Sequence, residues 1–161
     1  MKRTTLDVLY SQVAVFDTHL ELPFNDWTDV HVAQGFAWRH GSVSFMTLDD
    51  GGVMDVEVLI AGNRPRDRGG LPDPSPERCI VVPFHVPVHG QCVVATAIDS
   101  IPLELAPGEY ALTFEHGRWP SGEMWMVLRF DPVSTPVRAR VVIADSDLNP
   151  PDELVMTALP A

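Results

Sequence analysis

Short apolar runs separated by proline and glycine are the feature that most restricts the fold of this chain. The sequence has 15 Pro and 11 Gly among 161 residues, and they fall between apolar runs instead of in one block. Asp49-Asp50-Gly51-Gly52 predicts a hairpin turn, because Asp-Gly and Gly-Gly pairs tolerate the positive φ angles that such turns need. No strand–helix–strand spacing is present. The pattern predicts an all-β fold, an antiparallel β-sandwich of about eight or nine strands.

The N-terminal residues form the first predicted strand. Apolar and polar residues alternate through residues 5–17, and the phase of the alternation shifts at Ser11 and Gln12. A shift of this kind is typical of a β-bulge. We therefore expect one long strand with a bulge near its middle.

One short helix is predicted after this first strand. Asn25 or Asp26 can cap its N-terminus, because each offers a side-chain oxygen to free backbone N–H groups. The residues that follow at helical spacing are Trp27, Val30 and Ala33 or Gln34. Gly35 is the expected C-terminal stop.

The length of the chain suits one domain. A chain of 161 residues can bury a core without disulfides, and we expect a single β-sandwich domain over residues 1–145. Residues 146–161 are predicted to form an acidic, loosely ordered tail, because the chain after Ala144 has four acidic and no basic residues.

One internal segment has the composition of a loop. Residues 62–76 contain four Pro and three Arg, which predicts a mobile surface loop. Its arginines, Arg64, Arg66 and Arg68, are one place where anions can gather. In a chain with a net charge of −11, however, three arginines are better explained as solvated spacing residues of a loop than as an anion site.

The charge balance restricts the class of partner. Twenty-two acidic residues oppose eleven basic ones, which gives a sequence pI near 4.7. Binding to a nucleic-acid backbone needs clustered Lys and Arg, so direct nucleic-acid binding is disfavoured. An acidic surface serves solubility, and it also suits a basic protein partner whose approach it would steer.

The sequence also predicts where the protein is found. No apolar run approaches the roughly 20 residues needed to span a bilayer, and the N-terminus lacks the continuous apolar region of a signal peptide. We therefore expect a cytoplasmic protein without membrane insertion and with reduced cysteines. Cys79 and Cys92 lie in apolar stretches, which favours two core thiols over a redox pair.

Motifs of catalysis and of phosphate binding are absent from the sequence. It contains no GxGxxG, no GxxxxGK[ST] and no GxSxG. Three residues separate His85 from His89, but no Cys or Glu partner lies at a zinc-site spacing. Asp55 and Glu57 have the i, i+2 spacing of a solvated strand face. We expect a non-enzymatic protein with no cofactor and no metal site.

A second class of function stays open. Trp38, Trp119 or Trp125 could form the stacking platform of a β-sandwich that binds a small ligand or a carbohydrate. Trp27 has two readings of its own. Its ring either closes one end of the sandwich as a hydrophobic plug, or it is an exposed anchor between Asp26 and Asp29, as in an interface hot spot.

Three ordered motifs carry a resemblance to a known family. Residues 25–45 contain NDWTD, then A-x-GFAW, then GSVSF; residues 81–86 read VVPFHV, and residues 103–113 read LELAPGEYALT. This series resembles the competence protein J family, the DNA-entry nuclease inhibitors of bacteria. The loop at 62–76 looks longer than is typical of that family, and the chain after Asp131 looks extended.

The resemblance implies a protein that binds and silences a nuclease and that has no catalytic residues. A nuclease site is basic and holds phosphates, so an acidic protein can occupy it by placing carboxylates where DNA places phosphates. The implied partner is a basic nuclease, in competence or in an immunity or antitoxin role. The candidate partner-binding residues are Asp26, Trp27, Asp29, Asp49 and Asp50.

Overall fold

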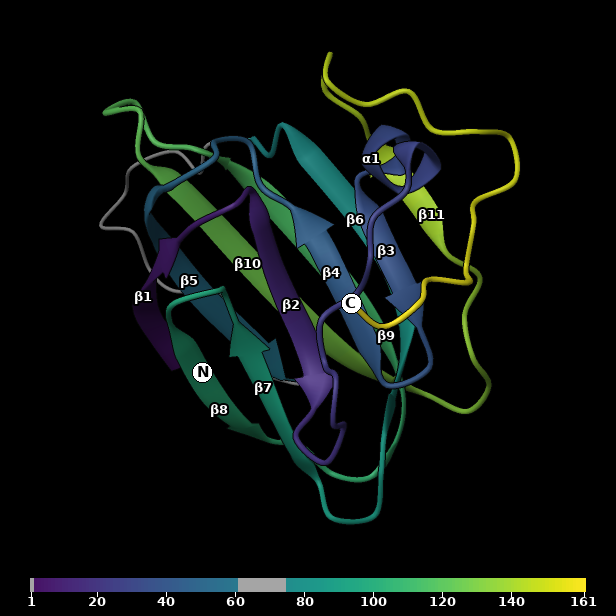
Figure 1. Cartoon of the computed structure of the whole chain (residues 1–161). Helices are drawn as coiled ribbons and strands as arrows, with labels where there is room; N and C mark the ends of the chain where they lie inside the picture. Colours follow the sequence, from purple (N-terminus) through teal and green to yellow (C-terminus); the bar gives the residue numbers. More distant parts are fainter. Residues whose placement is uncertain (1, 61–74) are drawn as a thin grey trace.

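Two β-sheets packed face to face, with one short helix at an end, make up the fold (Figure 1). The structure, a computed structural model, describes residues 2–60 and 75–161. The large sheet has six strands, in the spatial order β1 (Lys2–Val8), β5 (Gly52–Ile60), β10 (Met124–Val133), β9 (Gly108–Arg118), β6 (Arg78–Val86) and β11 (Arg140–Ile143). The small sheet has five strands, in the order β3 (Phe36–Arg39), β4 (Ser42–Met46), β2 (Gln12–Asp17), β7 (Gln91–Ala95) and β8 (Ser100–Glu104). The helix is α1 (Asp29–Gln34).

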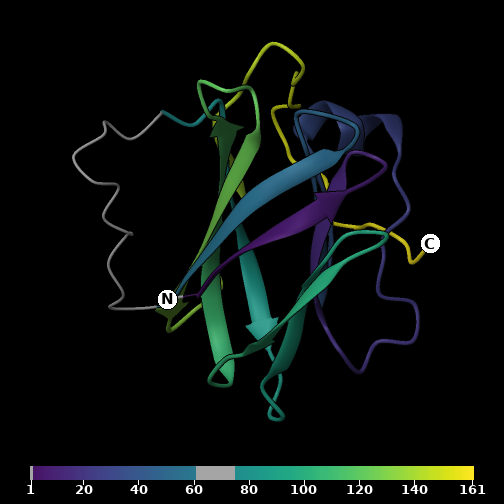
Figure 2. The same cartoon turned by 90° about the vertical axis from the view of Figure 1, so that its left-hand side faces the viewer.

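The core fills the space between the sheets, which Figure 2 shows from the side as two layers. Alternate residues of the central strands of the large sheet point inward, as the fully buried Leu112 and Phe114 of β9 show. Phe114 stacks on Phe45 of β4, with ring centroids 4.4 Å apart and ring planes 9° apart. Because β4 belongs to the small sheet, this aromatic pair joins the two layers.

The predicted β-sandwich with one short helix is confirmed, with two differences in the strands. The described residues hold eleven strands, more than expected. Pairing is antiparallel except between β5 and β10, which run parallel with Met124 opposite Met54 and Phe130 opposite Ile60. The alternation of apolar residues fixes which side chains point inward, but it does not specify the direction of a neighbouring strand.

The prediction of one long strand over residues 5–17 is wrong. The chain leaves the large sheet after β1 and enters the small sheet at β2, so the helix follows the second strand. The change of phase marks a tight turn at Tyr10 and Ser11, whose φ angles are 60° and 56°. The predicted hairpin at residues 49–52 also changes sheets, because β4 and β5 lie in different layers.

The helix begins at a different cap from the two predicted. Thr28 is the N-cap: its hydroxyl accepts a hydrogen bond from the His31 N–H, and the Thr28 N–H donates to His31 Nδ1. Asn25 is buried instead, where its amide donates to the Ala37 and Ser42 carbonyls. The other end is as predicted, since Gly35 ends the helix in the left-handed conformation with φ 87°.

The C-terminal segment, residues 144–161, lies against α1 and β3 (yellow in Figure 1). Its backbone N–H groups at Asn149 and Ala158 donate to the carbonyls of Ala33 and Trp38, each at 2.8 Å. This segment, predicted from its charge to be loosely ordered, thus makes more contacts with the rest of the chain than its composition suggests.

Two further sequence predictions concern particular segments. The basic loop with Arg64, Arg66 and Arg68 lies outside the residues that the structure describes. Within the described ranges, no helix has both the length and the apolar composition for a membrane span.

Candidate partner-binding surface

Trp27 lies between the helix and the turn that joins the two sheets. It precedes the N-cap and is half-buried, so it is neither a sealed plug nor a fully exposed anchor. Its indole N–H donates to Gln12 Oε1 at 3.2 Å, and its ring meets the His31 ring edge-to-face, with centroids 6.5 Å apart. Both contacts fix the direction of the ring while part of its face stays open to solvent.

A shallow hollow of about 290 Å³ opens beside this ring. Its lining residues are Tyr10, Ser11, Gln12, Trp27, Val32 and Met46. Tyr10 is 69% exposed and Val32 is 44% exposed, so two apolar side chains stand at the edge of the hollow. An aromatic-lined depression that stays partly open is the kind of feature that receives an anchor side chain from a partner.

Three of the predicted acidic residues are neighbours of residues that line this hollow. Asp26 and Asp29 flank Trp27 along the chain, and both are exposed. Asp50 is exposed on the connection from β4 to β5. Its Oδ1 accepts a hydrogen bond from the Ser11 hydroxyl, with 2.9 Å between the two oxygens. We call the hollow with these three acids the Trp27 surface. In the described part of the chain, none of the three acids takes part in an ion pair.

Asp49 is in a different situation from the other candidates. Its carboxylate lies 2.7 Å from Arg118 Nη2, and Arg118 also contacts Glu77 at 3.2 Å. The hydrogen bond that Arg118 donates to Asp49 is the main cause that raises the pKa of Arg118. Because its charge is balanced within the molecule, Asp49 contributes less to an acidic surface than its neighbour Asp50.

Sequence reasoning missed Tyr10 and Gln12 as parts of this surface. Tyr10 lies in the turn between β1 and β2 and Gln12 begins β2, whereas the alternation predicts the middle of one strand there. The polar pair Ser11 and Gln12, within an otherwise alternating run, could have indicated a turn, because Ser is common at turns.

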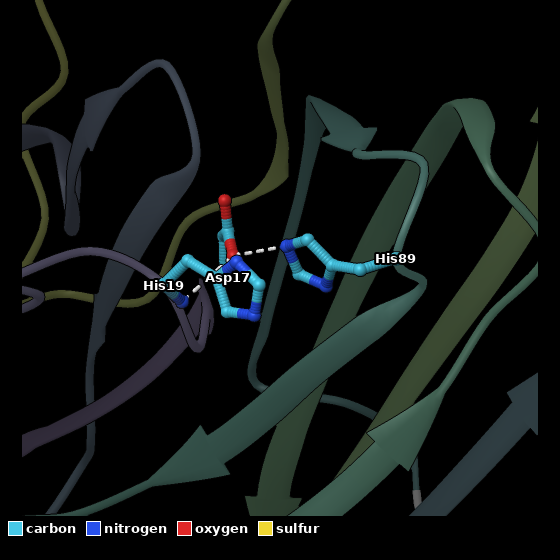
Figure 3. A group of neighbouring side chains, drawn as sticks. All are labelled: Asp17, His19 and His89. Carbon is cyan, nitrogen blue, oxygen red and sulfur yellow. Dashed lines mark hydrogen bonds and ion pairs between the residues drawn. The ribbon is translucent and has the colours of Figure 1, made fainter.

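A second cluster of chemical groups lies at the opposite end of β2, where Asp17, His19 and His89 meet (Figure 3). Their potential ligand atoms all lie within 4.8 Å of one another. The Gln91 N–H donates to His89 Nδ1, so the proton of the neutral ring is on Nε2, and this atom lies 2.8 Å from Asp17 Oδ1. The Asp17 carboxylate also accepts the backbone N–H of His19.

The arrangement of the two rings in this cluster does not suit a metal ion. A zinc ion lies in the plane of an imidazole, about 2.0–2.1 Å from the nitrogen. The His19 and His89 rings are stacked, with centroids 3.7 Å apart and planes 21° apart, so one ion cannot lie in both planes unless a ring turns. Coordination by His89 Nε2 would also move its proton to Nδ1, where the Gln91 N–H already points.

The tryptophans of the alternative hypothesis are occupied within the fold. Trp125 is 4% exposed and packs against Trp119, with ring centroids 6.1 Å apart. The indole N–H groups of Trp38 and Trp119 donate to the Pro83 carbonyl and to Asp55 Oδ2. Trp125 is buried, and Trp38 and Trp119 are half-buried with their N–H groups bound within the fold, which disfavours a stacking platform of these three rings.

Comparisons with known proteins agree with this description of a binding protein. Residues 5–132 match the family model described as competence protein J (ComJ). The chain is 28% identical over 112 residues to a DNA-entry nuclease inhibitor of Bacillus subtilis (strain 168), which covers 70% of this chain and 79% of that protein.

A solved structure has a similar fold. It is the crystal structure of ComJ, described as an inhibitor of the DNA degrading activity of NucA, from Bacillus subtilis. The TM-score is 0.64 at 20% sequence identity, over 83% of this chain and 96% of that chain. Residues 133–161 of the present chain lie beyond the part that matches the family.

Proposed function

Because this chain belongs to the competence protein J family, we propose that it is a non-enzymatic protein that binds a DNA-degrading nuclease and inhibits it by direct contact. The relative from Bacillus subtilis is a DNA-entry nuclease inhibitor, and the similar crystal structure is that of an inhibitor of NucA. A NucA-type nuclease is accordingly the class of partner that we propose.

The observation that carries the proposal is the Trp27 surface. It combines a partly open aromatic hollow with three exposed carboxylates that make no ion pair with the residues that the structure describes. A site that binds DNA is lined by cations, which attract these carboxylates as they attract phosphates. Close charge pairs across such interfaces couple by about 1.5–7 kcal/mol, so a few of them suffice for tight inhibition.

The Trp27 ring and the carboxylates have separate tasks in this mechanism. Asp26, Asp29 and Asp50 steer the nuclease during approach and pair with its cations. The hollow beside Trp27 receives a side chain of the nuclease and slows dissociation, because buried aromatic contacts dominate interface energies. The result is steric exclusion of DNA, which requires no chemical step by the inhibitor.

The test is an inhibition assay with a purified NucA-type nuclease from the same organism. We expect the chain to stop DNA cleavage at about equimolar concentration. The double variant Asp26→Asn with Asp29→Asn should slow association about tenfold, because electrostatic steering changes association rates by 10–10³-fold. Trp27→Ala should instead raise the dissociation rate.

A matched control removes the same charge elsewhere. Asp131 and Glu104 are exposed, and the strand registers place both at the end of the sandwich away from Asp50 and Gln12. Asp131→Asn with Glu104→Gln should leave association almost unchanged. Undiminished cleavage in the presence of the wild-type chain, together with a pulldown that recovers no nuclease, would overturn the proposal.

The predicted cytoplasmic location stays a prediction. Fractionation of cells that express a tagged chain tests it, with recovery in the membrane or secreted fraction as the contrary result.

A further inference from the structure

We infer that the C-terminal segment, residues 144–161, positions the Trp27 surface and thereby slows dissociation of the bound nuclease. This inference rests on the proposed function. The segment follows β11 and lies beyond the residues 5–132 that match the family. It therefore lies outside the matched part of the chain, although it contacts the candidate surface.

Helix α1 is too short to be stable alone. It has six residues, whereas isolated helices need roughly 12–15 residues to be even marginally stable in water. Its place on the molecule is consequently set by packing and by hydrogen bonds from other parts of the chain. The helix begins two residues after Trp27 and supplies Val32 to the hollow, so any shift of the helix changes the Trp27 surface.

The C-terminal segment forms hydrogen bonds with the C-terminal end of this helix. The Asn149 N–H donates to the Ala33 carbonyl at 2.8 Å, which is one of the carbonyls that a helix leaves without an internal partner. The buried side chain of Gln34 pairs with the backbone of Val155 in both directions. Its Nε2 donates to the Val155 carbonyl, and its Oε1 accepts the Val155 N–H, each at 2.9 Å.

The last residues of the segment hold the chain just before Trp27. The Asp26 N–H donates to the Leu159 carbonyl at 2.7 Å, and the Ala161 N–H donates to the Phe24 carbonyl at 2.9 Å. Asn25 and Pro160 form an antiparallel bridge between these two bonds. The segment therefore forms hydrogen bonds with both the residues before Trp27 and the helix after it.

Two contacts anchor the start of the segment to the core. Arg78 is 1% exposed and makes an ion pair with Asp145 at 2.8 Å, through both carboxylate oxygens. Leu148 is 8% exposed and packs where Gly35 and Ile80 meet. Farther along, the segment stands off from the strand β11 and leaves a hollow of about 680 Å³ between residues 138–141 and 150–156. The segment thus docks at the helix and the Trp27 surface, while it stays apart from β11.

The decisive variant removes two of these bonds without changing charge. Val155→Pro with Ala158→Pro eliminates the N–H groups that donate to Gln34 and to Trp38. We expect faster amide hydrogen exchange in residues 24–34 of the free protein and a dissociation rate from the nuclease at least tenfold higher. The association rate and its salt dependence should stay within about twofold, because the carboxylates are unchanged.

Thr157→Pro is the matched control. Thr157 is exposed, and its N–H donates none of the hydrogen bonds that the structure describes. This variant should exchange and dissociate like the wild type. A second variant that ends after Leu148 retains the Arg78–Asp145 pair and the Leu148 packing, and it serves if the proline pair fails to fold as judged by circular dichroism.

The two readouts separate this inference from the proposed function. If the wild type inhibits and the proline pair retains the wild-type dissociation rate, the inference is overturned and the proposed function stands. If the wild type inhibits no nuclease, the proposed function fails, and hydrogen exchange of residues 24–34 alone decides whether the segment orders the helix. Unchanged exchange in both variants overturns the positioning role.

Discussion

His116 is a fully buried titratable group whose protonation state the structure defines. Its Nδ1–H donates to the Trp125 carbonyl at 2.7 Å, and its Nε2 accepts the Leu48 N–H at 2.9 Å. Both ring nitrogens are satisfied in the neutral form, and protonation would place a proton against the Leu48 N–H. Burial is the main cause that lowers the pKa of His116 from 6.5 to about 4.

The first prediction follows from this pKa. Between pH 6.5 and 4 the unfolded chain binds a proton that the folded chain does not, so acid favours unfolding. The stability that neutral His116 contributes is complete above pH 6.5 and is lost progressively as the pH falls from there to about 4. The loss is about 1.4 kcal/mol per pH unit and roughly 3 kcal/mol in total. Urea unfolding at a series of pH values measures it.

His116→Gln is the variant that isolates this effect. We expect it to be less stable at pH 7, because the buried hydrogen bonds are lost, and to lose less stability on acidification than the wild type. Equal losses on acidification in the two proteins would contradict the assignment.

The second prediction concerns the cysteine thiols. Cys92 is 1% exposed, and burial, followed by the charge of Asp17, raises its pKa to about 11. Cys79 is also buried, and burial raises its pKa. Because the thiolate is the reactive form, a thiol reagent at about pH 8 should label neither cysteine in the native protein and both in urea. Rapid labelling of the folded chain would show that the core opens readily.

At the scale of elements, the end of helix α1 gives the third prediction. Gly35 has φ 87°, and an added Cβ would lie 3.1 Å from Leu148 and 3.2 Å from Ile80. Gly35→Ala should therefore lower the free energy of unfolding by roughly 2–4 kcal/mol, through backbone strain and overpacking together. Chemical denaturation gives the value.

Gly122→Ala is the control for backbone strain alone. Gly122 has φ 93°, but nothing lies within 4 Å of an added Cβ. Gly122→Ala should lower the free energy of unfolding by about 1–2 kcal/mol. If the two substitutions cost the same, the contact of Leu148 with the end of the helix contributes nothing to stability.

These elements also show what the sequence can and cannot predict. The Gly35 stop was predictable because a left-handed residue after a helix is a local requirement that glycine meets. The N-cap was not, because Asn25, Asp26 and Thr28 all have capping side chains. The contacts that select Thr28 come from Ala37, Arg39 and Ser42, which hold Asn25 in the core.

The candidate surface, too, was predictable from the sequence only in part. The sequence placed Asp26, Trp27 and Asp29 together because they are neighbours in the chain. It could not show that Ser11 brings Asp50 to the same face, or that Arg118, 69 positions away, pairs with Asp49. Contacts between distant residues depend on the order of strands, which alternation does not specify.

For the whole molecule, the net charge of −11 leads to the fourth prediction. Association with a basic nuclease should slow about tenfold or more between about 50 mM and about 500 mM salt, because screening shortens the range of the field. The dissociation rate should change much less. Stopped-flow or surface-based kinetics measure both rates. An association rate that is independent of salt would remove the steering role of the acidic surface.

The parallel pair in the middle of the large sheet has a consequence for synthesis on the ribosome. β5 lies beside β10, although β6 to β9 intervene in the sequence, and β10 begins only at Met124. While the chain is being made, β5 pairs with β1 on one side and has no neighbour on the other side until more than three quarters of the residues have been joined. Pairings between distant segments form slowly and leave apolar strands exposed meanwhile. A chain that ends before β10 therefore lacks the central strand of the large sheet, and the sheet can be completed only when translation is almost finished.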